Sequence, residues 1–179
     1  AWQGKLEMVS APLVNLPNYC LLWQIDADEL WTVEQWIKLR ELFLNHTERN
    51  SATFYCRFIV GPRLEIDRRS SPQEMEWRRV WKYRKGMVWL KHEPPILAFQ
   101  SPTGEWVDLA TKKPWWPVEM ENRGLVFEHQ AYATKAQVEF KEQYYGYQGL
   151  IEQWQRLQEG SFPVRLKEYF NLDWVEKDQ

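Results

Sequence analysis

The stretch Leu21–Trp31, LLWQIDADELW, sets the frame for the whole chain, because an apolar run ends there in three closely spaced carboxylates. Ionised carboxylates at the end of a buried strand repel one another and lose hydration, so a cation or hydrogen-bond donors must compensate them. Residues 19–25 are typical of a buried strand. Thr32-Val33-Glu34-Gln35 has the form of a capping box and predicts a helix over about 33–47. The order is strand, acidic turn, helix.

The remaining pattern predicts an α/β fold with a mixed sheet flanked by helices. Two polar, proline-containing segments, 61–77 and 92–117, are expected to be loops, and Gly146 and Gly149 weaken the longest helical pattern midway. Further strands are expected over 52–60, 79–83, 87–90 and 125–127, and the longest helix over about 135–158.

Length and composition favour one soluble domain spanning 1–179. The chain has 179 residues, a net charge of −2 and 44% hydrophobic residues, so no global charge favours nucleic acid or an anionic membrane. No apolar run approaches the roughly 20 residues that cross a bilayer, and no signal peptide is evident. Cys20 and Cys56 lie in apolar, strand-like runs and are expected to be free thiols, which together with these absences predicts a cytoplasmic protein.

Asp26 and Asp28 can be interpreted in two ways. On an extended backbone their side chains share a face, and in a tight turn both can converge on one divalent ion such as Mg²⁺ or Mn²⁺, which prefers hard oxygen ligands. Alternatively, they cap the helix that begins near Thr32 and favour its positive end, while Glu29 is solvated.

Tryptophan is unusually frequent, with 12 residues. Most are expected in the core, and the helical spacing of Trp36 and Trp154 marks those two as core residues. Three others fall in predicted loops, where they could stack on a sugar ring or pack beneath the loop: Trp106, Trp115 and Trp116.

A basic segment stands out in this acidic chain. Its guanidinium groups could bind a diphosphate in bidentate fashion, with Arg79 as the candidate, or the segment could be a solvated strand edge. The residues are Arg68, Arg69, Arg78, Arg79, Lys82, Arg84 and Lys85.

Two motifs together resemble family 2 glycosyltransferases with the type A fold. The first is the apolar strand followed by Asp26-Ala27-Asp28-Glu29 and a helix. The second is the run 127–134, FEHQAYAT, followed by 140–147, FKEQYYGY, which is similar to the C-terminal segment of a bacterial branch of that family, where Phe-x-His precedes a Lys-x-x-Tyr-Tyr-Gly-Tyr helix. The resemblance implies the C-terminal half of the type A fold, with 1–130 as a partial catalytic region and 131–179 as a C-terminal helical segment.

The resemblance also implies a metal-dependent transfer from a nucleotide-sugar donor to an unknown acceptor. Asp28 would be the direct metal ligand, His129 a second ligand, and Asp26 would lie near the ribose or the metal. Without the resemblance, a lone histidine such as His129 is more often a surface or hydrogen-bonding residue than a metal ligand. Only about 25 residues precede the first motif and the chain begins without Met. We therefore expect an excised piece or a reduced relative, and an excised piece could be inactive.

An inverting transfer needs a base that takes the proton of the acceptor hydroxyl. His92 and Glu93 are candidates because the adjacent Pro94-Pro95 pair stiffens the backbone where a strand ends, although a polar turn explains them as well. Asp67, Glu74 and Glu76 are alternatives in the long loop.

Two other classes of function compete with this one. The first is a non-catalytic carbohydrate-binding or protein-binding domain that uses the tryptophan-rich loops. The second is a metal-dependent phosphoesterase, but the sequence lacks the further clustered ligands that a two-metal site requires.

Overall fold

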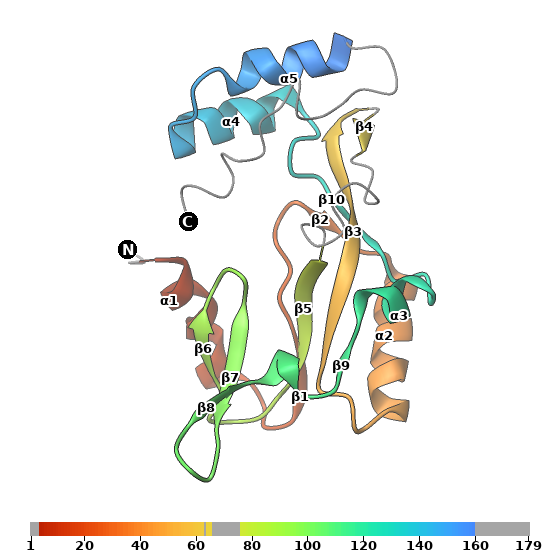
Figure 1. Ribbon diagram of the computed structural model, residues 1–179, viewed down its shortest axis with the longest axis vertical. Coiled ribbons are helices and arrows are strands. Elements are labelled where there is room, and N and C mark those ends of the chain that lie inside the picture. Colours follow the sequence, from red (N-terminus) through yellow and green to blue (C-terminus); the bar gives the residue numbers. More distant parts are fainter. Residues whose placement is uncertain (1–3, 63, 66–75, 160–179) are drawn as a thin grey trace. The chain divides into compact units, whose positions relative to one another are not determined.

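The computed structural model describes residues 4–62, 64–65 and 76–159 (Figure 1). These residues divide into two compact units. The first contains 4–27, 31–56 and 76–127, and the second contains 28–30, 57–62, 64–65 and 128–159.

The first unit holds an open sheet. Strand β5 (Glu76–Tyr83) lies between β1 (Cys20–Trp23) and the first part of β3 (Ser51–Gly61), and pairs antiparallel with both. Strand β9 (Pro114–Trp115) pairs with β3 in parallel, so the sheet is mixed. The helical elements of this unit are α1 (Lys5–Ser10), η1 (Ala11–Asn15), α2 (Val33–Asn45), η4 (Leu109–Thr111) and α3 (Pro117–Glu121).

A second, smaller sheet in this unit is an antiparallel meander of β6 (Val88–Lys91), β7 (Ile96–Gln100) and β8 (Trp106–Asp108). A hydrophobic cluster joins it to β5 and η1, because burial removes these apolar side chains from water. The buried members are Leu13, Trp81, Tyr83, Met87, Trp89, Leu97 and Leu109.

Helix α2 begins where the sequence predicts. Thr32 is its N-cap: the Thr32 hydroxyl accepts from the Gln35 backbone N–H, and the Gln35 side chain accepts from the Thr32 N–H. The Gln35 amide also donates to the Val126 carbonyl at 2.7 Å. Because Thr32 makes the cap, capping by Asp26 or Asp28 is wrong as an explanation of the acidic turn.

The second unit contains the other strands and two helices. Strand β10 (Phe127–His129) pairs antiparallel with β2 (Glu29–Leu30), and β4 (Leu64–Glu65) pairs antiparallel with the end of β3. Helices α4 (Lys135–Tyr145) and α5 (Leu150–Glu159) pack against each other (Figure 1). Val138 of α4 and three residues of α5 are buried: Leu150, Trp154 and Leu157.

The structure confirms a mixed α/β fold, and most of the expected strands lie within two or three residues of the predicted bounds. The single helix expected over 135–158 is wrong, because the chain leaves α4 at Gly146 and re-enters a helix after Gly149, both with a φ of 73°. Strands β7, β8 and β9 lie in a stretch expected to be a loop. Most of the loop expected over 61–77 lies outside the described residues.

Burial corrects four side-chain predictions. Glu29 is 7% exposed, so the expectation that it is solvated is wrong. Trp36 is 47% exposed, so its assignment to the core is wrong. Trp115 is 2% exposed and cannot stack on a sugar, whereas Trp154 is buried as expected. Arg79 is 2% exposed on a strand with neighbours on both sides, so it does not belong to a solvated strand edge.

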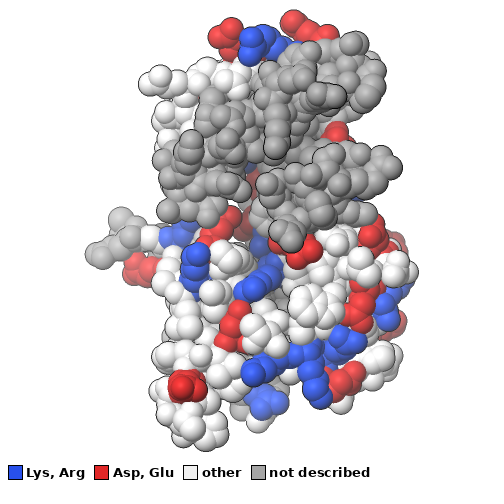
Figure 2. All heavy atoms as spheres, in the orientation of Figure 1, with Lys and Arg blue, Asp and Glu red and all other residues white. Residues whose placement is uncertain are grey.

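Three further features concern the cysteines, the lengths of the helices and the surface charges. Cys20 and Cys56 are both free, as expected. In the described ranges, no helix is long and apolar enough to span a membrane. Figure 2 shows Lys and Arg side chains interspersed with Asp and Glu on the face that it draws.

Leu97 tests the core of the first unit. Leu97 is fully buried in the cluster between β5 and the small sheet, so Leu97→Ala should lower the free energy of unfolding by about 2–5 kcal/mol through lost burial and a cavity. Leu90→Ala on the neighbouring strand β6 is the matched control, because Leu90 is 43% exposed and should cost much less. Urea denaturation followed by circular dichroism measures both, and equal losses would contradict the assignment.

Candidate functional site

Asp28 is held by backbone pairing between β2 and β10. In this antiparallel pair Glu29 lies opposite His129 and Leu30 opposite Glu128. One step before the paired residues, the Asp28 carbonyl accepts from the Gln130 N–H at 2.7 Å. Asp28 and Glu29, which lie far from His129 and Gln130 in the sequence, are therefore their neighbours in the second unit.

The Asp28 side chain has a cationic or donor group at each oxygen. Its Oδ1 lies 3.5 Å from His129 Nε2, and its Oδ2 lies 3.6 Å from Lys141 Nζ of α4. Exposure of the three side chains is 27% for Asp28, 9% for His129 and 20% for Lys141. The structure thus brings together the two residues predicted as metal ligands and adds a lysine.

Aromatic rings form the walls of this cluster. The Phe58 ring meets the His129 ring edge to face, with centroids 4.9 Å apart, and Lys141 Nζ lies 4.4 Å from the centroid of the Tyr132 ring. Tyr132 is 3% exposed, and its backbone N–H donates to the Ile59 carbonyl while its carbonyl accepts from Trp154 Nε1. The two rings cover His129 and Lys141, whose side chains are 9% and 20% exposed, and electrostatic interactions are stronger where less water is in contact.

Helix α4 is fixed where it leaves β10. Thr134 and Gln137 form a capping box, and the Gln137 amide also donates to the Gln130 carbonyl at 2.9 Å. This bond ties the first turn of α4 to the residue that follows His129. The position of Lys141, two turns into the helix, follows from that anchor.

The charges around Asp28 favour its ionised form. The hydrogen bond with His129 is the largest cause, and with the charges of His129 and Lys141 it lowers the pKa of Asp28 to about 2 from its ordinary 3.8, although burial opposes the shift. Burial raises the pKa of Tyr132, so this phenol stays neutral. The carboxylate at the centre of the cluster is ionised across the physiological range of pH.

The ligand atoms of Asp28 and His129 fit a divalent ion in part. Carboxylate oxygen and imidazole nitrogen both suit Mn²⁺, and two adjacent ligands of an octahedral ion with bonds of ~2.1 Å are about 3.0 Å apart. The observed 3.5 Å between Oδ1 and Nε2 needs only a small side-chain rotation to match. No group of three His, Cys, Asp or Glu side chains that could hold a metal occurs in the described part of the chain. The remaining ligands would then be water or substrate phosphate.

Asp26 has a different partner, in the first unit. Its Oδ2 accepts from Arg79 Nη2 at 2.9 Å, and Arg79 also donates to the Arg78 carbonyl and lies over the Trp77 ring. Arg79 is 2% exposed and the Asp26 side chain 42%. The two residues predicted to bind the nucleotide therefore contact each other, and Asp26 is the one that faces solvent.

His92 and Glu93 lie at the turn between β6 and β7, also in the first unit. His92 Nδ1 is 3.9 Å from Glu93 Oε2, and the Glu93 side chain is 38% exposed. Glu93 is therefore accessible, and its role as a base stays a prediction. Of the alternatives, Glu76 is exposed at the start of β5, whereas Asp67 and Glu74 lie outside the described residues, as do Arg68 and Arg69.

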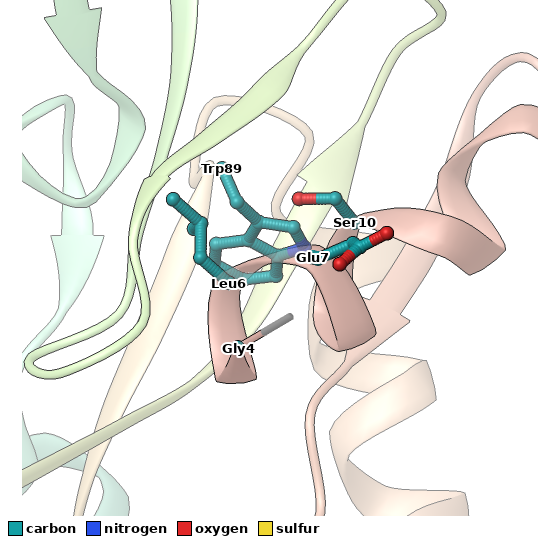
Figure 3. A pocket seen from close by; sticks show the side chains of 5 residues that line it. All are labelled: Gly4, Leu6, Glu7, Ser10 and Trp89. Carbon is teal, nitrogen blue, oxygen red and sulfur yellow. The ribbon is translucent and has the colours of Figure 1, made fainter. Parts of the chain in front are cut away.

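The three tryptophans expected in loops differ in exposure, and the pocket described below does not include the predicted site residues. Trp115 is covered by the guanidinium groups of Arg49 and Arg123, at 4.2 and 4.7 Å from its ring, whereas Trp106 and Trp116 are 47% and 59% exposed. An open pocket of about 450 Å³ lies between α1 and Trp89 (Figure 3). Its lining contains none of the predicted site residues: Gly4, Leu6, Glu7, Ser10 and Trp89.

Sequence reasoning missed Lys141 and Tyr132 as members of the cluster. Both belong to the stretch that carries the resemblance, but spacing alone assigns neither to Asp28, because their contacts depend on how α4 packs. The capping box at Thr134 is the sequence signal that could have indicated Lys141, because it fixes where α4 begins and hence which helical turn carries Lys141.

The pKa of Asp28 gives a testable dependence of stability on pH. A pKa depressed on folding stabilises the protein above the ordinary value of 3.8, and that contribution is lost as pH falls toward 2. Asp28→Asn should therefore be less stable than the wild type by about 2 kcal/mol at pH 6, and the difference should shrink at pH 2.5. Urea denaturation at both pH values measures it. Glu105→Gln, at an exposed site between β7 and β8, should show no such convergence, and a gap for Asp28→Asn that does not change with pH would refute the assignment.

Comparison with known proteins adds no further assignment. No family model, curated protein or solved structure matches the chain.

Proposed function

We propose that the chain carries the metal-binding and donor-binding part of a glycosyltransferase that transfers a sugar from a nucleotide-sugar donor to an acceptor. The observation that supports it is the 3.5 Å approach of His129 Nε2 to Asp28 Oδ1. The resemblance to family 2 enzymes, which rests on sequence motifs, assigns the metal to the same two residues.

Asp28 and His129 would hold Mn²⁺ or Mg²⁺ in this proposal. When bound, the ion stabilises the negative charge of the departing diphosphate as a Lewis acid. The low exposure of His129 and its contact with the Phe58 ring hold the imidazole in one orientation. Such fixed ligands reduce the entropy that must be lost when an ion and a donor bind.

Asp26 and Arg79 would serve the nucleotide. Arg79 is buried and engaged by Asp26, so it acts by orienting that carboxylate rather than by contacting the donor. Asp26 is accessible and can accept from a ribose hydroxyl. His92 and Glu93 remain the proposed base, with Glu93 accepting the proton of the acceptor hydroxyl.

A second candidate is a metal-independent carbohydrate-binding or protein-binding domain. The exposure of Trp106 and Trp116, at 47% and 59%, favours it, since tryptophan side chains are enriched at interfaces. It predicts binding that is lost in Trp116→Ala and unaffected by a chelator.

Calorimetry with Mn²⁺ and a uridine diphosphate sugar tests the glycosyltransferase proposal. The wild type should bind the sugar nucleotide only when Mn²⁺ is present, because phosphates complete the ligand set. Asp28→Asn should weaken this binding at least tenfold, because loss even of a residue that only supports a metal ligand costs about 10- to 100-fold in affinity. Glu105→Gln is the matched acidic control and should bind as the wild type does. Equal binding by wild type and Asp28→Asn, or binding that survives a chelator, would count against the proposal.

A further inference from the structure

Lys141 occupies a position that the proposed metal site does not by itself require. Its ammonium lies 3.6 Å from Asp28 Oδ2 and 4.4 Å from the centroid of the Tyr132 ring, and the side chain is 20% exposed. Lys135 of the same helix forms an ion pair with Glu139 one turn away, and the Lys135 side chain is 54% exposed. Lys141 reaches instead to a residue of a distant segment.

A largely buried carboxylate such as that of Asp28 needs a counter-charge at all times, whether or not a metal is bound. The ammonium of Lys141 provides it at Oδ2 while His129 faces Oδ1. The Tyr132 ring holds the ammonium in place, because the face of an aromatic ring attracts a cation. Asp28 is therefore compensated by the protein alone.

The same arrangement opposes a second cation. A divalent ion on Asp28 would lie within a few ångströms of the Lys141 ammonium. Because aromatic rings replace part of the surrounding water there, the repulsion between the two cations is stronger than it would be in water. Two cations that share one carboxylate repel each other, so each lowers the affinity of the other.

We propose that Lys141 is a built-in counter-ion of Asp28 that competes with the divalent cation and weakens its binding in the absence of a donor. The inference rests on the proposed function, because it assumes that Asp28 is a metal ligand. Lys141 is a positioning residue: it holds the carboxylate ordered without the ion, and it makes tight metal binding depend on the added negative charge of a diphosphate. Substrate phosphates next to the ion would then offset the repulsion from the ammonium.

Mn²⁺ alone, without nucleotide, is the probe that tests this role. Free Mn²⁺ is measured by electron paramagnetic resonance in titrations of the wild type, Lys141→Gln, Lys141→Arg and Lys135→Gln. Removal of the competing charge in Lys141→Gln should tighten Mn²⁺ binding about tenfold. Lys141→Arg keeps the charge and should bind as weakly as the wild type, and Lys135→Gln controls for the loss of a positive charge on the same helix.

The outcomes separate the two proposals. If the wild type binds Mn²⁺ and Lys141→Gln binds it equally or more weakly, the role of Lys141 is wrong and the metal site stands. If Lys135→Gln tightens binding as much as Lys141→Gln, the effect is only net charge and the role of Lys141 is again wrong. If Mn²⁺ alone binds none of the four proteins, the role of Lys141 is wrong, and the proposed function is decided separately by the calorimetry with Mn²⁺ and a uridine diphosphate sugar. Circular dichroism spectra establish that each variant is folded.

Discussion

The compensation of one carboxylate organises the second unit. Asp28 is ionised and three-quarters buried, and a charge in that setting is tolerated only beside opposite charge or hydrogen-bond donors. The chain provides these from two other segments, His129 at the end of β10 and Lys141 on α4. Strand pairing, the start of α4 and the aromatic walls all place these groups at the two oxygens of Asp28. The cluster therefore links the local order of the acidic turn to the tertiary packing of this unit.

Local patterns in the sequence predict the parts of the fold that local physics decides. The apolar run before Asp26, the strand over 52–60 and the capping box at Thr32 each depend on neighbouring residues, and each is found as expected. The strands in 92–117 escape prediction because they are short and lie among prolines, and because the pairing of β9 with β3 depends on a distant partner. The helix over 135–158 was predicted too long because its periodicity continues across Gly146 and Gly149, which nevertheless adopt left-handed conformations.

Residue chemistry predicts that the carboxylates of the site need compensating groups, but it does not predict which groups provide them. The crowding of Asp26 and Asp28 correctly indicates that each carboxylate needs compensation, but spacing suggests one shared ion, whereas the structure gives them separate partners in Arg79 and His129. The buried state of Arg79 could not be read from an alternating basic strand, because alternation looks the same at an edge and in the middle of a sheet. Trp36 shows the same ambiguity in the opposite direction, since helical spacing does not tell which face a neighbouring element covers, whereas Trp115, like Arg79, is buried where the sequence allows exposure.

The capping boxes at Thr32 and Thr134 restrict the chemistry allowed at their third helical position. Glutamate and glutamine serve equally well there in general, because either side chain accepts from the N-cap. In this chain Gln35 and Gln137 also donate, to the carbonyls of Val126 and Gln130 on either side of β10. A carboxylate cannot donate, so deamidation of either residue would leave a main-chain carbonyl facing a negative charge. Slow chemical ageing at these two amides would thus loosen the three-residue strand that carries the imidazole.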